Sequence, residues 1–232
     1  MEKNLLKRAA WIEVDLQALR ENFANIKALV PAETQIVAVV KANAYGHGAV
    51  PVAQCLLAEG ASRLAVATLD EALELRAAGI NAPIMLLGFC GDAPEVLRLA
   101  VAQQVILPLY SLAMGKAVSR AAQAEGRPAL CQLVLDSGMG RIGLLPTDEA
   151  QQEALAIAKL PGLQLEGMFS HFAAADELDK THAKKQLTVY QQFAADLAAA
   201  GLELPLLNIA NSAAIMEMPG AHLDMVRAGI IL

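Results

Sequence analysis

A lysine stands at the end of a strongly apolar run in residues 36–48, IVAVVKANAYGHG. Burying an unpaired ammonium group costs free energy, so Lys41 must either reach solvent or serve a chemistry that needs a shielded amine. An amine in an apolar setting is a nucleophile suited to attack on a carbonyl carbon. The stretch therefore predicts a reactive lysine at the tip of a buried strand, with Tyr45 on the loop that follows it.

Other polar residues stand at or just beyond the ends of further apolar runs. They supply two guanidinium groups, an imidazole, an amide and a hydroxyl; the second arginine lies on the last run itself and is followed by a glycine. These residues are Arg141 in DSGMGRIG, His171 in GMFSHF, Asn211 and Ser212 in NIANSAA, and Arg227 and Gly229 in VRAGI. Together these groups suit an anionic, planar ligand that carries a carbonyl.

Strand-like and helix-like runs alternate along the chain. Most of the strand-like runs are continuously apolar, which favours parallel strands covered on both faces. Amphipathic stretches such as 69–79 and 147–160 lie between them. The strand candidates are 11–16, 36–41, 63–68, 83–88, 105–110, 131–136, 165–171, 206–210 and 225–232. From residue 36 onward there are eight strands, each but the last followed by a helix, which predicts an α/β protein with a TIM (β/α)8 barrel.

The two ends depart from a plain barrel. Residues 11–16 predict an extra N-terminal strand ahead of the barrel, and the last predicted strand runs to Leu232. We therefore expect a barrel truncated in its eighth strand, without an eighth helix. The expected division is an N-terminal extension with a surplus strand at 1–16 and a barrel domain at 17–232.

In such a barrel the carboxyl ends of the strands carry the chemistry, so these polar residues should meet at one rim. The loops after strands seven and eight commonly bind phosphate, and Ser212 and Gly229 lie there. Pyridoxal 5′-phosphate (PLP) combines an aldehyde for Lys41, a phosphate for Ser212 and a ring nitrogen for Arg227. Because arginine keeps its proton, the nitrogen facing it must be an acceptor, which favours mild α-proton chemistry.

The segments VVKANAYGHG, DSGMGRIG, SHFA, ANSAA and VRAGI resemble the N-terminal barrel of the bacterial alanine racemases over essentially the whole chain. The resemblance implies a cytoplasmic, PLP-dependent isomerase that converts L-alanine to D-alanine for peptidoglycan synthesis. It implies that Lys41 forms the Schiff base with PLP and is one of two catalytic bases. Arg141 and His171 are the other residues that we expect to be catalytic: Arg141 would contact the phenolic oxygen and the substrate carboxylate, and His171 would lie in the polar network beside Arg227. Arg227 would contact the pyridine nitrogen. The resemblance also implies a phosphate site formed by Tyr45, Ser212, Gly229 and Ile230, beside Asn211.

Two departures from the family pattern stand out. In that family the second base is a tyrosine of a C-terminal β-domain, supplied across a homodimer interface, and this domain is not part of the 232 residues. We therefore expect the chain to bind PLP but to racemise poorly. Many members also have a carbamylated lysine at the position of Val134, so support for Arg141 must come from elsewhere.

Composition narrows the alternatives. The net charge of −6 and the lack of a basic stripe argue against a nucleic-acid partner. No apolar run approaches the roughly 18 residues of a membrane span, and the N-terminal residues do not resemble a signal peptide. Three scattered cysteines suit reduced thiols in the cytoplasm, and no His or Cys spacing suggests a metal. The alternatives left open are a stand-alone PLP-binding homeostasis barrel, a serine-type racemase domain, and a barrel whose site is incidental.

Overall fold

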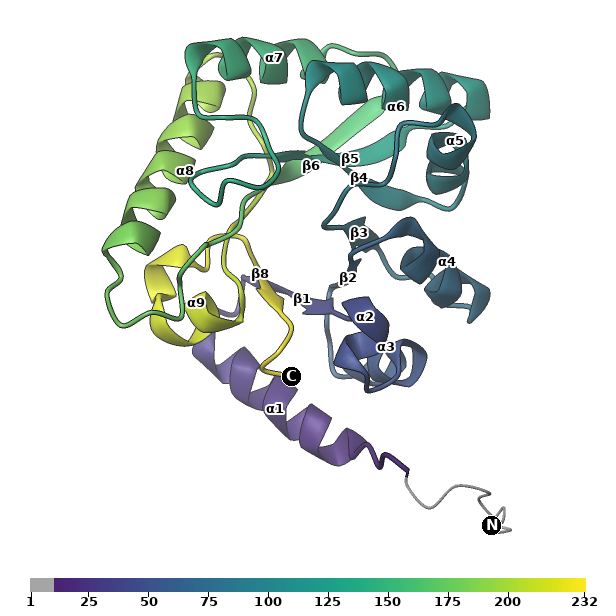
Figure 1. Ribbon diagram of the computed structural model, residues 1–232, viewed down its shortest axis with the longest axis vertical. Coiled ribbons are helices and arrows are strands. Elements are labelled where there is room, and N and C mark those ends of the chain that lie inside the picture. Colours follow the sequence, from purple (N-terminus) through teal and green to yellow (C-terminus); the bar gives the residue numbers. More distant parts are fainter. Residues whose placement is uncertain (1–10) are drawn as a thin grey trace.

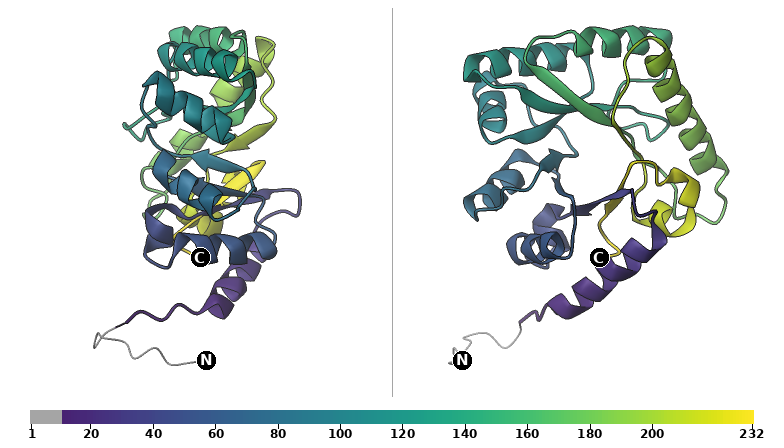
Figure 2. Two further views of the ribbon diagram at one scale, coloured as in Figure 1. Left: turned by 90° about the vertical axis from the view of Figure 1, so that its right-hand side faces the viewer. Right: turned by 180° about the vertical axis from the view of Figure 1, so that it is seen from behind.

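The computed structural model describes residues 11–232 as eight parallel strands inside a ring of helices (Figure 1, Figure 2). Hydrogen-bonded neighbours follow the order β7-β6-β5-β4-β3-β2-β1-β8, so each strand except β8 lies beside its sequence neighbour. The strands are β1 (Gln35–Val39), β2 (Arg63–Val66), β3 (Ile84–Leu86), β4 (Val105–Leu109), β5 (Ala129–Val134), β6 (Leu163–Phe169), β7 (Leu206–Asn208) and β8 (Met225–Ala228). The predicted TIM barrel is confirmed.

Helices connect the successive strands, as the alternation of the sequence predicts, and a further helix, α1, precedes β1. They are α1 (Leu16–Leu29), α2 (Lys41–Tyr45), α3 (Ala49–Ala58), α4 (Leu69–Ala77), α5 (Pro94–Ala102), α6 (Leu112–Glu125), α7 (Asp148–Ala158), α8 (Thr181–Ala199) and α9 (Ser212–Glu217), with a 3-10 turn η1 (Pro219–Ala221). Within residues 11–232, no helix is long and apolar enough to cross a membrane.

The barrel closes incompletely between β7 and β8. In the described residues these two strands share no ladder, although the backbone N–H of Arg227 donates to the Ala210 carbonyl at 3.0 Å. The Asp224 carboxylate also accepts from the Leu207 N–H at 2.8 Å. The sheet is thus a nearly closed barrel. At the seam between β7 and β8, one backbone hydrogen bond and the Asp224 side chain connect the two sides.

Alternation along β1 decides which residues face the barrel interior. Ile36 and Ala38 pack outward in the large core under the helices, whereas Val37 and Val39 belong to a small cluster inside the barrel. Because side chains alternate with a period of two, Lys41 falls on the inward side, just past the strand's end.

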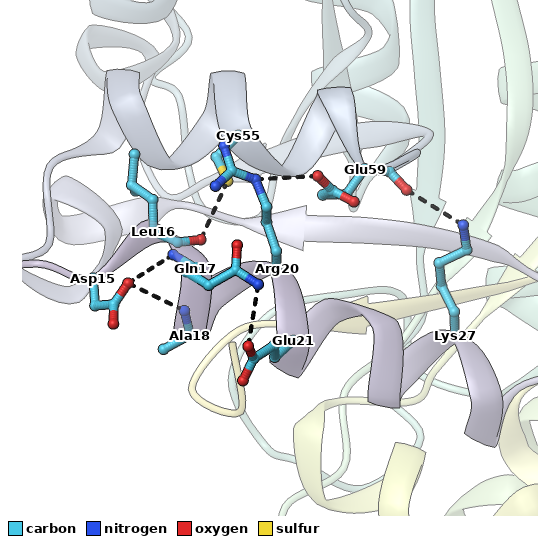
Figure 3. Close-up of polar contacts among 9 residues, drawn as sticks. All are labelled: Asp15, Leu16, Gln17, Ala18, Arg20, Glu21, Lys27, Cys55 and Glu59. Atoms are coloured by element: carbon cyan, nitrogen blue, oxygen red, sulfur yellow. Dashed lines mark hydrogen bonds and ion pairs between the residues drawn. The ribbon is translucent and has the colours of Figure 1, made fainter.

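The extra strand predicted at 11–16 is wrong for the described residues. Residues 11–15 have no regular structure, and α1 begins at Leu16. A strand needs a neighbour for its backbone groups, and Trp11 and Ile12 are instead 63% and 81% exposed. The Asp15 carboxylate accepts from the N–H groups of Gln17 and Ala18 and so caps the helix (Figure 3). Residues 1–10 of the predicted extension lie outside the described residues.

The predicted truncation within the eighth strand is also wrong. β8 ends at Ala228, where its pairing with β1 ends, and a turn follows in which the Leu232 N–H donates to the Gly229 carbonyl at 2.9 Å. The prediction failed because the apolar run 225–232 continues past the last strand partner.

Helix α1 takes the place expected for an eighth helix. It packs against α3 and α9 and buries Phe23 and Ile26 (Figure 1). Arg20 forms an ion pair with Glu59 at 3.2 Å, and the Lys27 ammonium donates to the Glu59 carbonyl at 3.3 Å (Figure 3). A helix that precedes β1 thus covers the β8–β1 side, so the expected gap in the helical ring is filled.

If α1 is an integral part of the barrel, Phe23→Ala should lower the free energy of unfolding by about 3–5 kcal/mol, because a fully buried ring is replaced by a cavity. Urea denaturation measures this change. Leu29→Ala at the exposed end of the same helix is the control and should change it by less than about 0.5 kcal/mol. Equal effects of the two substitutions would show that α1 is only an appendage.

Candidate active site

All residues of the predicted site line two adjoining pockets at the carboxyl end of the barrel. One pocket of about 430 Å³ is lined by Arg141 and by apolar residues that include Leu87, Val134 and Phe169. The other, of about 360 Å³, is lined by Tyr45, Asn211, Ser212, Gly229 and Ile230. Lys41, His171 and Arg227 line both pockets.

Lys41 stands at the start of a left-handed helical turn. After Val40 donates to the Ala65 carbonyl at 2.9 Å, four residues adopt φ values near +50°. These residues are Ala42, Asn43, Ala44 and Tyr45. The turn reverses the chain within a few residues, so that Lys41 and Tyr45 line the same pocket.

Arg227 is a buried cation with neutral partners. Its side chain is 3% exposed and donates to the Ser170 carbonyl at 2.7 Å and to the Asn208 side-chain oxygen. It also lies over the Phe169 ring at 5.7 Å. Burial lowers the pKa of Arg227 to about 10, so it remains charged at neutral pH. Among the described residues, its hydrogen-bond partners include no carboxylate.

His171 is held in one tautomer by Arg227. The two lie 3.1 Å apart through His171 Nδ1, and because a guanidinium only donates, Nδ1 must be the acceptor and Nε2 must carry the proton. Burial lowers the pKa of His171 to about 3, aided by the charges of Arg227, Arg141 and Lys41. A neutral imidazole whose free lone pair is already engaged can donate a hydrogen bond but is a poor base.

Gln186 of α8 holds the loops behind His171. It is 1% exposed, accepts from the Ala173 N–H at 2.9 Å and donates to the His171 carbonyl at 3.1 Å. The Ser137 and Ser170 hydroxyls are bonded to each other at 2.9 Å beside it. Sequence reasoning missed this group. The signal that could have found it is a polar residue on the buried face of an amphipathic helix.

The loop that carries Arg141 is organised by Asp136. Its carboxylate accepts from the N–H groups of Gly138, Met139, Gly140 and Arg141 at 2.8–3.0 Å. Burial alone would raise the pKa of Asp136, but these N–H donors outweigh it and hold the pKa below its usual value. Gly143, at φ +136°, allows the loop to close, since a Cβ there would lie 2.5 Å from the Asp136 nitrogen.

The side chain of Arg141 is exposed and makes no hydrogen bond within residues 11–232. Val134, the position at which the sequence resemblance implies a carbamylated lysine, is buried in the apolar barrel interior. The support for Arg141 therefore comes through its own backbone, at 2.8 Å from Asp136 Oδ2.

The remaining predicted residues form the other end of the site. Ser212 Oγ accepts from the Gly229 N–H at 3.1 Å, and Asn211 caps α9 by accepting from the Ala214 N–H. A Cβ on Gly229 would lie 2.5 Å from the Tyr45 hydroxyl, so only glycine lets the phenol approach the backbone here. Ile230 follows and is 78% exposed. A hydroxyl, a phenol and a backbone N–H gathered in this way suit an anion such as phosphate.

The lowered pKa of His171 predicts how the stability of the fold depends on pH. The unfolded chain protonates this imidazole below about pH 6.5, whereas the native state keeps it neutral down to about pH 3. Stability should therefore fall as the pH drops through this window, because the unfolded state binds more protons. In His171→Gln, the loss of Tm between about pH 7 and about pH 5 should be smaller than in the unsubstituted chain.

His182→Gln is the matched control, because this histidine is exposed on α8. Its Tm should fall with pH as in the unsubstituted chain. An equal fall of Tm in His171→Gln would mean that the native imidazole is protonated.

Comparison with known proteins matches this geometry to one family. The family model "Alanine racemase, N-terminal domain" matches residues 14–232. The alanine racemase of Clostridium tetani is 45% identical over 225 residues, which cover 97% of this chain and 57% of the relative. The alanine racemase of Desulforamulus reducens is 44% identical over 227 residues, which cover 98% of this chain and 61% of the relative. The alanine racemase structure from Clostridium difficile 630 superimposes with a TM-score of 0.94 at 41% identity. The superposition covers 97% of this chain and 59% of that structure's chain.

The chain thus spans about three fifths of the length of these relatives. The match extends over almost all of the described barrel and includes the rim on which the two pockets lie. The resemblance seen in the sequence motifs is therefore confirmed: the chain belongs to the alanine racemase N-terminal domain family.

Proposed function

We propose that this chain is the PLP-binding barrel of an alanine racemase that interconverts L- and D-alanine. The observation that carries the proposal is the shared wall of the two pockets. Lys41, His171 and Arg227 stand between an anion-binding end at Ser212 and an apolar pocket whose mouth holds Arg141. This arrangement suits a ligand with a phosphate at one end and a reactive carbonyl at the other.

The residues present fit PLP. Ser212, Gly229, Tyr45 and Ile230 would hold its phosphate beside Asn211, Arg227 would face the ring nitrogen, and Arg141 would meet the phenolic oxygen and the substrate carboxylate. When bound, PLP supplies an aldehyde and an electron-withdrawing ring. Lys41 supplies the amine and moves a proton on one face of the substrate's α-carbon.

Arg227 tunes the site toward proton exchange. It can only donate, so a ring nitrogen placed against it must remain an unprotonated acceptor, which limits electron withdrawal. His171 is neutral and bonded to Arg227, so the cation stays oriented without a carboxylate. These two residues favour reversible removal of the α-proton over more demanding chemistry.

A racemase needs a second proton donor and acceptor on the opposite face of the substrate. Burial raises the pKa of Tyr45, and its hydroxyl lies close against the backbone at Gly229, which suits anion binding rather than base catalysis. We propose that the second base comes from outside the described barrel, across a homodimer interface, and that residues 11–232 by themselves turn over slowly.

The substrate and the setting follow from the relatives. The Bacillus anthracis alanine racemase, with a TM-score of 0.89 at 39% identity, is a structure with bound L-Ala-P, which supports an alanine-sized substrate here. We propose that the enzyme acts in the cytoplasm and supplies D-alanine for peptidoglycan. The free, buried state of Cys55, Cys90 and Cys131 supports a reducing compartment.

Borohydride trapping tests the role of Lys41. With PLP present, reduction should fix the cofactor on the peptide that contains Lys41, as read by mass spectrometry, because only this amine lines both pockets. The adduct should be lost in Lys41→Ala and kept in Lys116→Ala, which removes an exposed lysine of α6. An equal yield of adduct in Lys41→Ala would refute the assignment.

Ser212→Ala tests the phosphate end. The substitution should weaken PLP binding roughly tenfold, because one hydrogen bond to a charged group is lost. Binding of pyridoxal, which has no phosphate, should not change. Both affinities can be measured by absorbance titration. Equal losses for the two ligands would place the phosphate elsewhere.

A further inference from the structure

Glu71 bridges the ends of the first two barrel strands. Its Oε1 accepts from the N–H of Ala42, the residue directly after Lys41, at 2.6 Å. Its Oε2 accepts from the Ala67 N–H, just past β2, at 2.7 Å. Glu71 itself lies in the first turn of α4, so one carboxylate connects a helix, the end of β2 and the segment that carries Lys41.

A helix cap alone does not explain this geometry. Thr68 and Glu71 do form a capping box, in which Glu71 Oε2 accepts from the Thr68 N–H at 3.3 Å. The bond to Ala42 is shorter and leaves the helix altogether, reaching a residue 29 positions away in the sequence. Hydrogen bonds to a charged acceptor are roughly twice as strong as neutral ones, and the bonds from Ala42 and Ala67 are both much shorter than the bond from Thr68 within the capping box.

The segment that donates this bond has an energetically unfavourable backbone conformation. Ala42 has φ +50° and ψ +48°, a left-handed conformation that is unfavourable for a non-glycine residue. Such conformations persist only where the surroundings enforce them. The turn's own bonds begin with the Ala44 N–H, which donates to the Val40 carbonyl at 2.9 Å. The Ala42 N–H precedes that first bond, and Glu71 supplies its acceptor.

We propose that Glu71 is a positioning residue for Lys41. By holding the Ala42 N–H against the end of β2, it sets the direction in which the lysine side chain leaves the barrel wall and enters the pocket shared with His171 and Arg227. Ala67, whose N–H also donates to Glu71, lines that same pocket. The inference rests on the proposed function in taking Lys41 as the amine that reacts with PLP.

Three single substitutions in the full chain separate positioning from helix stability. Glu71→Gln keeps the size of the side chain but leaves only one oxygen for three backbone N–H donors. Thr68→Ala breaks the other half of the capping box and leaves the bond to Ala42 intact. Asp70→Asn removes the same charge from the same helical turn, at an exposed residue without a role in the site. Tm measures the helix effect in each.

The first readout is hydrogen exchange of the Ala42 amide, observed by NMR. It should accelerate about tenfold or more in Glu71→Gln and change little in the other two variants. The second is the reaction of Lys41 with PLP, followed by absorbance as a function of pH and by borohydride trapping. We expect at least about tenfold weaker capture and a shifted pH midpoint in Glu71→Gln alone.

Unchanged exchange at Ala42 in Glu71→Gln would overturn the proposal. So would PLP capture that falls equally in Thr68→Ala, since the effect would then be one of helix stability. If the unsubstituted chain fails to capture PLP at Lys41, the proposed function fails. The positioning role of Glu71 is then tested by the rate at which acetic anhydride acetylates Lys41. A changed rate of Lys41 acetylation in Glu71→Gln alone then supports it, and equal rates in all variants reject it.

Discussion

The buried guanidinium of Arg227 is the interaction on which both the barrel and its pocket depend. The backbone ladder is interrupted between β7 and β8, and Arg227 spans this seam with its side chain. From β8 it reaches the Asn208 side chain on β7 and the Ser170 carbonyl just past β6. The same group fixes the tautomer of His171. A cation buried in this way is tolerated because both terminal nitrogens donate to neutral acceptors and an aromatic face lies against it.

The charge balance at the rim depends on which groups the nearby carboxylates bind. Asp136 and Glu71 are both close to the site, yet both accept from backbone N–H groups and neither forms an ion pair within residues 11–232. Three cationic side chains, Lys41, Arg141 and Arg227, line the pockets, and Asp176 is the one acidic residue beside them in the described residues. A chain with a net charge of −6 thus presents a locally positive site, which is what an anionic ligand requires.

Backbone order, rather than side-chain pairing, sets the geometry of this site. Arg141 is exposed, but its backbone is anchored through Asp136, and the closing residue Gly143 has a conformation that only glycine adopts readily. Lys41 begins a turn whose left-handed residues would relax if they were not held. In both cases an acidic residue near a strand end provides the anchor, so the site is preorganised before any ligand arrives.

Much of this organisation was determined by the sequence alone. The alternation of apolar runs and amphipathic stretches predicted the barrel, and the period of two along β1 places Lys41 on the inward side with Val37 and Val39. The motifs around Lys41, Arg141, His171, Ser212 and Arg227 predicted which residues meet at the rim. These features are local, since each depends on residue types and spacing within one element and on the rule that parallel strands share one carboxyl edge.

The tertiary structure decided what depends on partners distant in the sequence. Residues 11–15 form no strand because no neighbour pairs with them, and β8 ends where β1 stops pairing. α1 fills the last place in the helical ring because its apolar face fits between α9 and α3. Gln186 and Glu71 look like ordinary helix residues in sequence and become part of the site only through backbone groups brought to them by folding. Local pattern sets which elements form, and the availability of distant hydrogen-bond partners sets where they end and what holds them.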